Sequence, residues 1–247
     1  MINAQFFDVI RANENGGFLG GGGKWPLKRS DSRNETSSHN QLEPWPPSEV
    51  ISKYTELMAI RENSGGHNLL KCHFFNAWFH KYVCTTRIIA KGDKKIEDIY
   101  YDRNDVKIEC IIRKIPYDLK SKEKIMIPLN EMSHWYLLVI DLKRKIFSIY
   151  SSLKGHQTST YINTMVSRLK IHLLKNCEIE CDGFTVSIDQ ECPQQPNSVD
   201  CGVYLMKFME CLSRGDVFDF NSACRLITIR KEYNSYMELF LLKCGWG

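Results

Sequence analysis

A cysteine that directly follows a turn-rich segment is the strongest candidate for covalent chemistry in this sequence. Cys201 comes after residues 193–200, and apolar residues recur behind it at helical spacing: Val203, Tyr204, Met206 and Phe208. This pattern places Cys201 at the N-terminus of a helix, where the dipole and the free N–H groups stabilise a thiolate and lower the thiol pKa. We therefore expect a nucleophile, with a buried structural thiol as the alternative for any one of the ten cysteines.

A cysteine nucleophile needs a base and a group that stabilises the oxyanion. His134 opens an apolar segment and is followed by Trp135, whereas Gln195 lies six residues before Cys201, near enough for its amide to face the same pocket. A single histidine at the start of a strand is more often an ordinary surface or core-edge residue. The three residues together, rather than any one of them, indicate a catalytic site.

The third member of such a site is an acceptor that fixes the tautomer of the base. Segments 134–141 and 146–151 resemble the two strands of a hairpin, and a two-residue turn at 142–143 would set Ser151 directly opposite His134. This turn lacks the usual Gly or Asn, so the pattern defines the register only to within a residue or two. In this arrangement the group at position 151 accepts from Nδ1 of His134, and Nε2 faces Cys201.

The periodicity of the chain predicts the elements that hold these residues. Apolar spacing predicts helices at 48–61, 74–83, 158–175, 202–213 and 223–242. Aromatic and β-branched residues predict strands at 106–112, 124–129, 134–141, 146–151 and 178–188. This order indicates an α+β architecture, a small mixed sheet with helices around it.

Composition divides the 247 residues into a leader and one folded domain. Residues 1–43 are rich in Gly, Ser and other polar residues and predict a flexible leader, whereas residues 44–247 predict a single domain. A net charge of +4 does not indicate nucleic-acid binding. No signal segment occurs, and no apolar run approaches the roughly 20 residues of a membrane helix. The cysteines are therefore interpreted as reduced thiols of an intracellular protein without a membrane partner.

Four residues offer metal-ligand types in a second arrangement, namely His172, Cys177, Cys181 and Cys192. Their spacing matches no common zinc finger, and the stretch runs from a predicted helix into a predicted strand. We therefore expect no metal and no other cofactor.

Three separated segments resemble the ubiquitin-like-protein-specific proteases, whose best-known members are the SUMO (sentrin) proteases and which are distantly similar to adenovirus protease. Residues 134–142 are similar to the His-Trp strand of this family, and PQQPN at 193–197 with DCG at 200–202 is similar to its nucleophile loop. Residues 73–76 and 218–220 resemble supporting segments. The resemblance runs from about Trp45 to the C-terminus and implies a papain-like cysteine protease fold.

The resemblance assigns roles by position. It implies that Cys201 is the nucleophile, that His134 is the general base, and that Gln195 and the Cys201 backbone N–H form the oxyanion hole. The family places an aspartate seventeen residues after the histidine, but position 151 is a serine here. Asp182 or Asp189 is the alternative source of the missing carboxylate, although neither is near the hairpin in sequence.

The resemblance also suggests how a substrate tail would enter. Trp45 and Trp135 would flank the narrow tunnel that admits a Gly-Gly tail, with ordinary core packing as the alternative for both tryptophans. Ser48 stands where the family often has an aspartate that contacts the substrate.

The implied function is that of a cysteine-type peptidase cleaving after the C-terminal Gly-Gly of SUMO or a related ubiquitin-like protein, in deconjugation or precursor processing. Loss of the acid lowers turnover of a serine protease on the order of 10⁴-fold, but a cysteine thiol is more acidic and tolerates the loss better. The expected enzyme is active but slowed by Ser151. The alternative is a catalytically lapsed module that still binds a ubiquitin-like protein. A nuclear, monomeric protein is the expectation from the same resemblance.

Overall fold

The computed structural model describes residues 48–64, 71–84, 90–91, 94–154, 159–189, 191–218 and 220. A mixed five-stranded sheet runs in the order β1-β4-β5-β6-β7. The central strands β4 (Lys124–Glu131), β5 (His134–Asp141) and β6 (Ile146–Tyr150) are antiparallel. The outer strands β1 (Cys72–Phe74) and β7 (Thr185–Asp189) pair in parallel with β4 and β6. The sheet thus contains the predicted hairpin at its centre.

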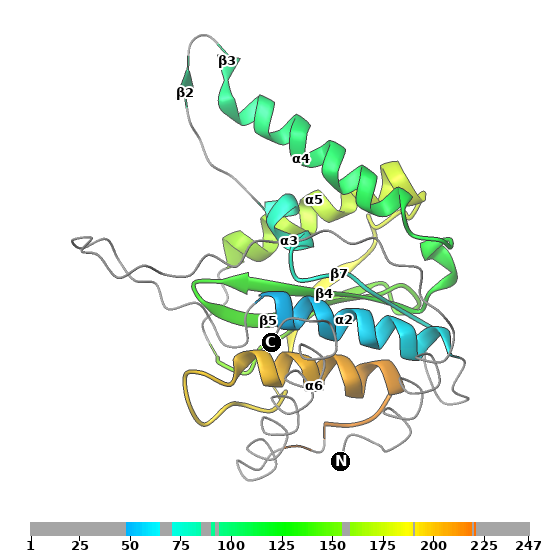
Figure 1. The fold of residues 1–247 in the computed structure, drawn as a ribbon, viewed down its shortest axis with the longest axis vertical. Coiled ribbons are helices and arrows are strands. Elements are labelled where there is room, and N and C mark those ends of the chain that lie inside the picture. The colour runs from blue at the N-terminus through cyan, green and yellow to red at the C-terminus, as the bar shows by residue number, and fades with distance from the viewer. Residues whose placement is uncertain are drawn as a thin grey trace, which may run out of the picture. The chain divides into compact units, whose positions relative to one another are not determined.

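Helices cover both faces of this sheet (Figure 1). One face carries α3 (Phe79–Cys84), α4 (Ile96–Arg113) and α5 (Ser159–Cys177), whereas α2 (Ser48–Asn63) and α6 (Cys201–Arg214) lie on the other. A short hairpin of β2 (Ala90–Lys91) and β3 (Lys94–Lys95) precedes α4, and the 3-10 helix η1 (Leu119–Ser121) follows it. This arrangement confirms the predicted α+β class.

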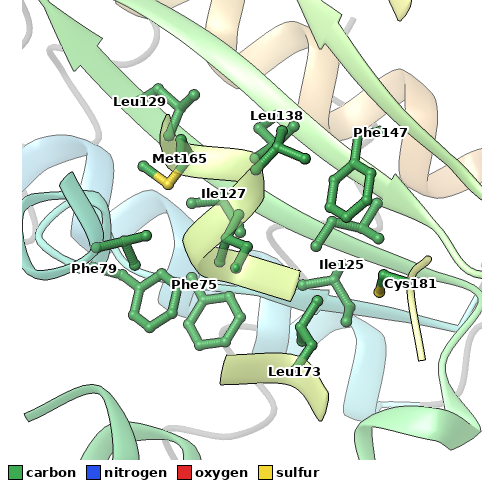
Figure 2. Close-up of a cluster of buried hydrophobic side chains, with 14 of the residues drawn as sticks. Phe75, Phe79, Ile125, Ile127, Leu129, Leu138, Phe147, Met165, Leu173 and Cys181 are labelled. Atoms are coloured by element: carbon green, nitrogen blue, oxygen red, sulfur yellow. The ribbon is translucent and has the colours of Figure 1, made fainter. Parts of the chain in front are cut away.

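The main hydrophobic core fills the space between the sheet and α3, α4 and α5. Alternate residues of β4 and β5 point into it, as the two-residue period of a strand requires. Figure 2 shows strand residues meeting the aromatic side chains of Phe75 and Phe79 and the helical residues Met165 and Leu173. This core fixes the face from which each residue of β5 projects.

The opposite face of β5 is buried as well, because α6 packs against it. Trp135, Leu137 and Val139 are each at most 2% exposed. Five aromatic rings on and beside α6 make edge-to-face contacts with one another: Tyr150, Tyr204, Phe208, Phe218 and Phe220. A strand covered on both faces holds its residues rigidly, and His134 is the first residue of this strand.

Some predicted elements were wrong. Residues 106–112 form part of α4, because their apolar side chains alternate with charged ones at a spacing that a helix also satisfies. Residues 74–83 contain the end of β1 and most of a short helix, and the strand predicted at 178–188 begins only at Thr185. The leader 1–43, Trp45 and the predicted helix 223–242 lie outside the described residues.

The turn between β4 and β5 has an unusual backbone. Met132 and Ser133 both adopt left-handed conformations, with φ of 49° and 62°. Two-residue hairpin turns require such angles, and Asn-Gly is the pair that usually provides them. The turn directly precedes His134, so the chain accepts strain at this point.

Candidate active site

The side chains of His134 and Ser151 lie in contact at one end of the sheet. His134 is the first residue of β5, Ser151 follows the last residue of β6, and His134 Nε2 lies 3.0 Å from Ser151 Oγ. Both residues are buried, each with 3% exposure. The structure therefore brings together the two residues that the sequence placed opposite each other.

The register of the hairpin nevertheless differs from the predicted one. The turn has four residues, 142–145, rather than two, so Ser151 is in line with Tyr136 one step beyond the last ladder pair. The contact with His134 is diagonal, between residues two apart on the same face. The predicted contact forms because a shift of two residues keeps every side chain on its face.

The ring nitrogen that faces Ser151 is Nε2, whereas the sequence interpretation had assigned Nδ1 to this contact. The imidazole of His134 stacks on Tyr136, with centroids 6.0 Å apart and planes at 23°, and this orientation directs Nε2 toward the end of β6. Ser151 Oγ donates its only hydrogen to the Leu153 carbonyl at 2.9 Å, so it accepts from Nε2–H. His134 Nδ1 then carries the lone pair.

Cys201 is the first residue of α6, as predicted. The backbone carbonyl of Asp200 accepts hydrogen bonds from the first turn of the helix. The Cys201 thiol lies against the backbone N–H of Trp135, the residue after His134. The start of α6 and the start of β5 therefore meet, and the candidate nucleophile lies beside the strand that carries the candidate base.

The groups around Cys201 shift its thiol pKa in both directions. Burial raises the thiol pKa most strongly, and the charge of Asp200 raises it further. The backbone N–H groups of Trp135, Gly202 and Cys201 itself lower the pKa, but the net direction is upward. The predicted lowering was therefore wrong, because the helix terminus lies in a buried site where desolvation outweighs the N–H groups.

The loop before Cys201 is shaped by Asn197. The side-chain carbonyl of Asn197 accepts from the N–H groups of Val199 and Asp200, at 2.9 and 3.0 Å. Its amide nitrogen donates to the Asp200 carboxylate at 2.6 Å. These bonds form a local turn that needs no distant partner, so the sequence of the loop largely determines its shape.

Gln195 is buried, with its side chain fixed at both ends of the amide. Oε1 accepts from the hydroxyl of Ser152 at 2.6 Å, and Nε2 donates to the carbonyl of Asn197 at 2.5 Å. A carbonyl can only accept, so the second bond defines which end of the amide is nitrogen. One N–H of Nε2 is occupied by Asn197, and the amide carries a second.

A further set of contacts was not foreseen from the sequence. Gln194 Nε2 donates to the Ser151 carbonyl at 3.0 Å, and Cys192 Sγ lies 3.1 Å from the same oxygen. The Tyr204 hydroxyl in turn donates to the Gln194 carbonyl at 3.1 Å. These contacts connect the nucleophile loop to the residue that holds His134. In the sequence, the only indication of these contacts was the first glutamine of the PQQ motif, Gln194.

Trp135 is 1% exposed and its ring meets His80 of α3 edge to face, with centroids 6.2 Å apart. Burial lowers the pKa of His80 to about 4, so this imidazole is neutral at physiological pH. The predicted role of Trp135 in a substrate tunnel stays a prediction, and Trp45 lies outside the described residues.

Other residues from the resemblance have structural contacts. His73 Nδ1 lies 2.8 Å from the Tyr117 hydroxyl, and Asn76 Oδ1 accepts from two N–H groups at the start of α3. Ser48 is the first residue of α2. Asp189 Oδ1 accepts from the N–H groups that follow β7, which commits this carboxylate to its own loop.

Two of the four residues that were considered and rejected as zinc ligands contact other parts of the chain. His172 Nε2 lies 3.2 Å from the Asp105 carboxylate, whereas Cys192 lies beside Ser151. Among the described residues, no cluster of three His, Cys, Asp or Glu side chains has a metal-binding arrangement. In the same part of the chain, no helix is long and apolar enough to span a membrane.

Comparison with known proteins identifies relatives of this domain. Ubiquitin-like-specific protease 1A of Arabidopsis thaliana is 29% identical over 173 residues, which cover 69% of this chain and 32% of the relative. Sentrin-specific protease 5 of Mus musculus is 26% identical over 207 residues, covering 80% of this chain and 23% of the relative. The chain thus spans a third or less of the length of these curated relatives.

A solved structure has the same fold. The C-terminal Ulp1 protease domain in complex with Smt3, the yeast ortholog of SUMO, superposes with a TM-score of 0.58 at 21% identity, covering 76% of this chain and 74% of that one. This likeness confirms the predicted papain-like fold. Residues 45–240 match the family model described as "Ulp1 protease family, C-terminal catalytic domain". With four-fifths of its length in that match, the chain belongs to the Ulp1 protease family.

Proposed function

We propose that this domain is a cysteine peptidase that cleaves after the C-terminal Gly-Gly of SUMO or a related ubiquitin-like protein, from a conjugate or a precursor. Cys201 is the nucleophile, His134 the base, Gln195 an oxyanion donor, and Ser151 the acceptor behind the base. One observation carries the proposal: the Cys201 thiol lies against the N–H of Trp135, directly after a buried His134 whose Nε2 is held by Ser151.

The tautomer of His134 defines the proton path in this proposal. Nδ1 takes the thiol proton as the sulfur attacks the carbonyl carbon of the terminal glycine. The imidazolium returns that proton to the leaving amine nitrogen as the C–N bond breaks, which leaves a thioester on Cys201. Water then gives a proton to Nδ1 and attacks the thioester, and the departing thiolate recovers the proton.

The resting state of the pair follows from the site's charges. Burial raises the thiol pKa, and the hydroxyl of Ser151 brings no negative charge to the imidazole. Both effects favour a neutral thiol beside a neutral imidazole rather than a preformed ion pair. We therefore propose a working enzyme whose rate is lower than that of a relative with an aspartate at this position.

Gln195 is placed to stabilise the tetrahedral intermediate. Its amide is held by Ser152 and Asn197, and the second N–H of Nε2 is the proposed donor to the oxyanion, together with the backbone N–H of Cys201. A donor that is fixed before the reaction needs no reorganisation when the charge appears. This prearrangement favours acyl transfer over simple binding as the role of the loop.

The choice of substrate rests on family membership. The related yeast domain was solved in complex with Smt3. A Gly-Gly tail lacks side chains, so it suits a narrow passage beside Trp135, with Trp45 as the proposed second wall. We further propose that residues 44–247 form the catalytic domain behind a flexible leader, and that the protein acts as a nuclear monomer.

The decisive experiment uses electrophilic probes made from SUMO and other ubiquitin-like proteins, each ending in a thiol-reactive group after Gly-Gly. The wild-type domain should form a covalent adduct with at least one probe, and mass spectrometry should locate it on Cys201. Cys201→Ala should form none while still binding the unmodified protein. An adduct on the wild type that persists in Cys201→Ala would refute the assignment.

Ser151 favours one alternative function, a lapsed protease-fold module that binds a ubiquitin-like protein without cleaving it. The family's aspartate is replaced by Ser151, whose hydroxyl contacts His134 Nε2. The same probes separate the two functions. Binding without any adduct or hydrolysis, by wild type and by Ser151→Asp alike, would establish the binding module.

A further inference from the structure

A carboxylate faces the candidate base from the neighbouring strand. Glu131 ends β4, His134 begins β5, and the two residues are direct partners in the antiparallel ladder. Direct partners project from the same face with Cβ atoms about 4.5–5.5 Å apart. The side chain of Glu131 therefore leaves the sheet on the same side as the imidazole.

A tyrosine holds this carboxylate near the imidazole. The Tyr136 hydroxyl donates to Glu131 Oε2 at 2.8 Å, and the Tyr136 ring is the one on which His134 stacks. Tyr136 is fully buried and Glu131 is half-buried, so solvent screens the carboxylate only in part. Glu131, Tyr136 and His134 thus form one packed group on one face of the β4–β5 hairpin.

We infer that Glu131 is a positioning residue that acts through His134, supplying from β4 the negative charge that Ser151 does not supply. The inference rests on the proposed role of His134 as base. Ser151 fixes the tautomer through Nε2, and Glu131 favours the imidazolium that forms when Nδ1 takes the thiol proton. In this site the two functions of one acidic residue are divided between a hydroxyl and a carboxylate on different strands.

The other groups around Cys201 and His134 do not cancel the negative charge of Glu131. The thiol of Cys201 faces from α6, with the Asp200 carboxylate behind it at the helix start, and the Ser151 hydroxyl from the end of β6 is neutral. His80 of α3 lies behind Trp135 and is neutral because burial lowers its pKa. Asp200 acts mainly on the thiol, where its charge raises the pKa and opposes the ion pair. Among these described neighbours, Glu131 is the carboxylate directly across from His134.

Glu131→Gln tests this inference, because the amide keeps an acceptor for the Tyr136 hydroxyl and removes only the charge. The rate at which iodoacetamide alkylates Cys201, followed by mass spectrometry of that peptide against pH, reports the thiolate fraction. We expect the alkylation rate at pH values below the thiol midpoint, where the thiolate exists only together with the imidazolium, to fall about three- to tenfold, because that imidazolium becomes less favourable. With a fluorogenic ubiquitin-like substrate, kcat should fall about three- to tenfold, and KM should stay within about twofold.

Two further variants make the test specific. Glu123→Gln removes a charge just before the other end of β4 and should leave both readouts unchanged. In the Ser151→Asp background, Glu131→Gln should cost less than about twofold in kcat, since the second carboxylate makes the first redundant.

The outcomes separate this inference from the proposed function. If Cys201 is alkylated at the same rate in Glu131→Gln as in the wild type at every pH, the proposed role of Glu131 is wrong. This holds whether kcat is unchanged or falls together with Tm. A wild-type domain that hydrolyses no ubiquitin-like substrate would refute the peptidase, but the alkylation profile would still decide whether Glu131 acts on the pair.

Discussion

The nucleophile side and the base side of the site are held in different ways. On the nucleophile side, Asn197 shapes the loop, and Gln195 is bonded at both ends of its amide. On the base side, His134 contacts the neutral hydroxyl of Ser151 and stacks on Tyr136. The nucleophile side thus combines a local turn at Asn197 with a hydrogen bond from the distant Ser152, whereas the base contacts a hydroxyl after β6 and an aromatic ring of its own strand. The departure from the family pattern lies on the base side.

Removing the donor on the nucleophile side should have the largest effect among the following variants. Gln195→Ala deletes an interaction that is made only with charge developing in the transition state, so kcat should fall about 10²- to 10³-fold with little change in KM. Steady-state kinetics with a fluorogenic substrate measure both constants. A rise in KM at unchanged kcat would instead assign Gln195 to loop structure and weaken the contrast between the two sides.

Restoring an acid on the base side should have a smaller effect of opposite sign. Ser151→Asp places a carboxylate where His134 Nε2 now meets a hydroxyl, which should stabilise the imidazolium and raise kcat about 10- to 100-fold, or about 1.4 to 2.7 kcal/mol in the barrier. Ser151→Asn is the neutral control and should give no such gain. If Ser151→Asp folds with an unchanged Tm but reacts no faster, another group already provides the charge, with Glu131 as the first candidate.

The smallest of the three effects concerns the hydroxyl that holds Gln195. Ser152→Ala leaves Oε1 without its donor, and the freed amide should lower kcat about tenfold. In a Gln195→Ala background the same change should cost almost nothing further, because the group it positions is gone. Ser213→Ala, which deletes another fully buried hydroxyl near the end of α6, controls for a general loss of stability. If the two substitutions instead lower kcat by independent factors that multiply in the double variant, Ser152 supports the fold rather than the Gln195 amide.

Long and strongly patterned elements could be predicted from the sequence. The bounds of β5 match the prediction at both ends, and those of α6 differ by one residue, because each carries a continuous apolar pattern with a clear start. The stretch 106–112 was mistaken for a strand because its short apolar period fits both structures, and only its packing on α3 and α5 decides for a helix.

The site could be predicted in its residues but not in its detail. Contact between Ser151 and His134 followed from strand parity, which tolerates a shift of two residues. The ring nitrogen depends on the stacking with Tyr136, and the thiol pKa depends on burial, neither of which a sequence displays. Glu131 escaped notice for a related reason: its position opposite His134 depends on the tight turn between β4 and β5. The catalytic roles themselves stay predictions.

That turn has a consequence for protein engineering. Two left-handed residues that are not glycine cost roughly 1–2 kcal/mol each, and Met132 and Ser133 bring this cost to the position directly before His134. Met132 is also 78% exposed, so the turn has little packing to offset the cost. Met132→Asn with Ser133→Gly would relieve the strain and raise the thermal stability of the hairpin. If the double substitution raises Tm but lowers kcat, the strained turn reduces the stability of the hairpin and in return orients His134 for catalysis.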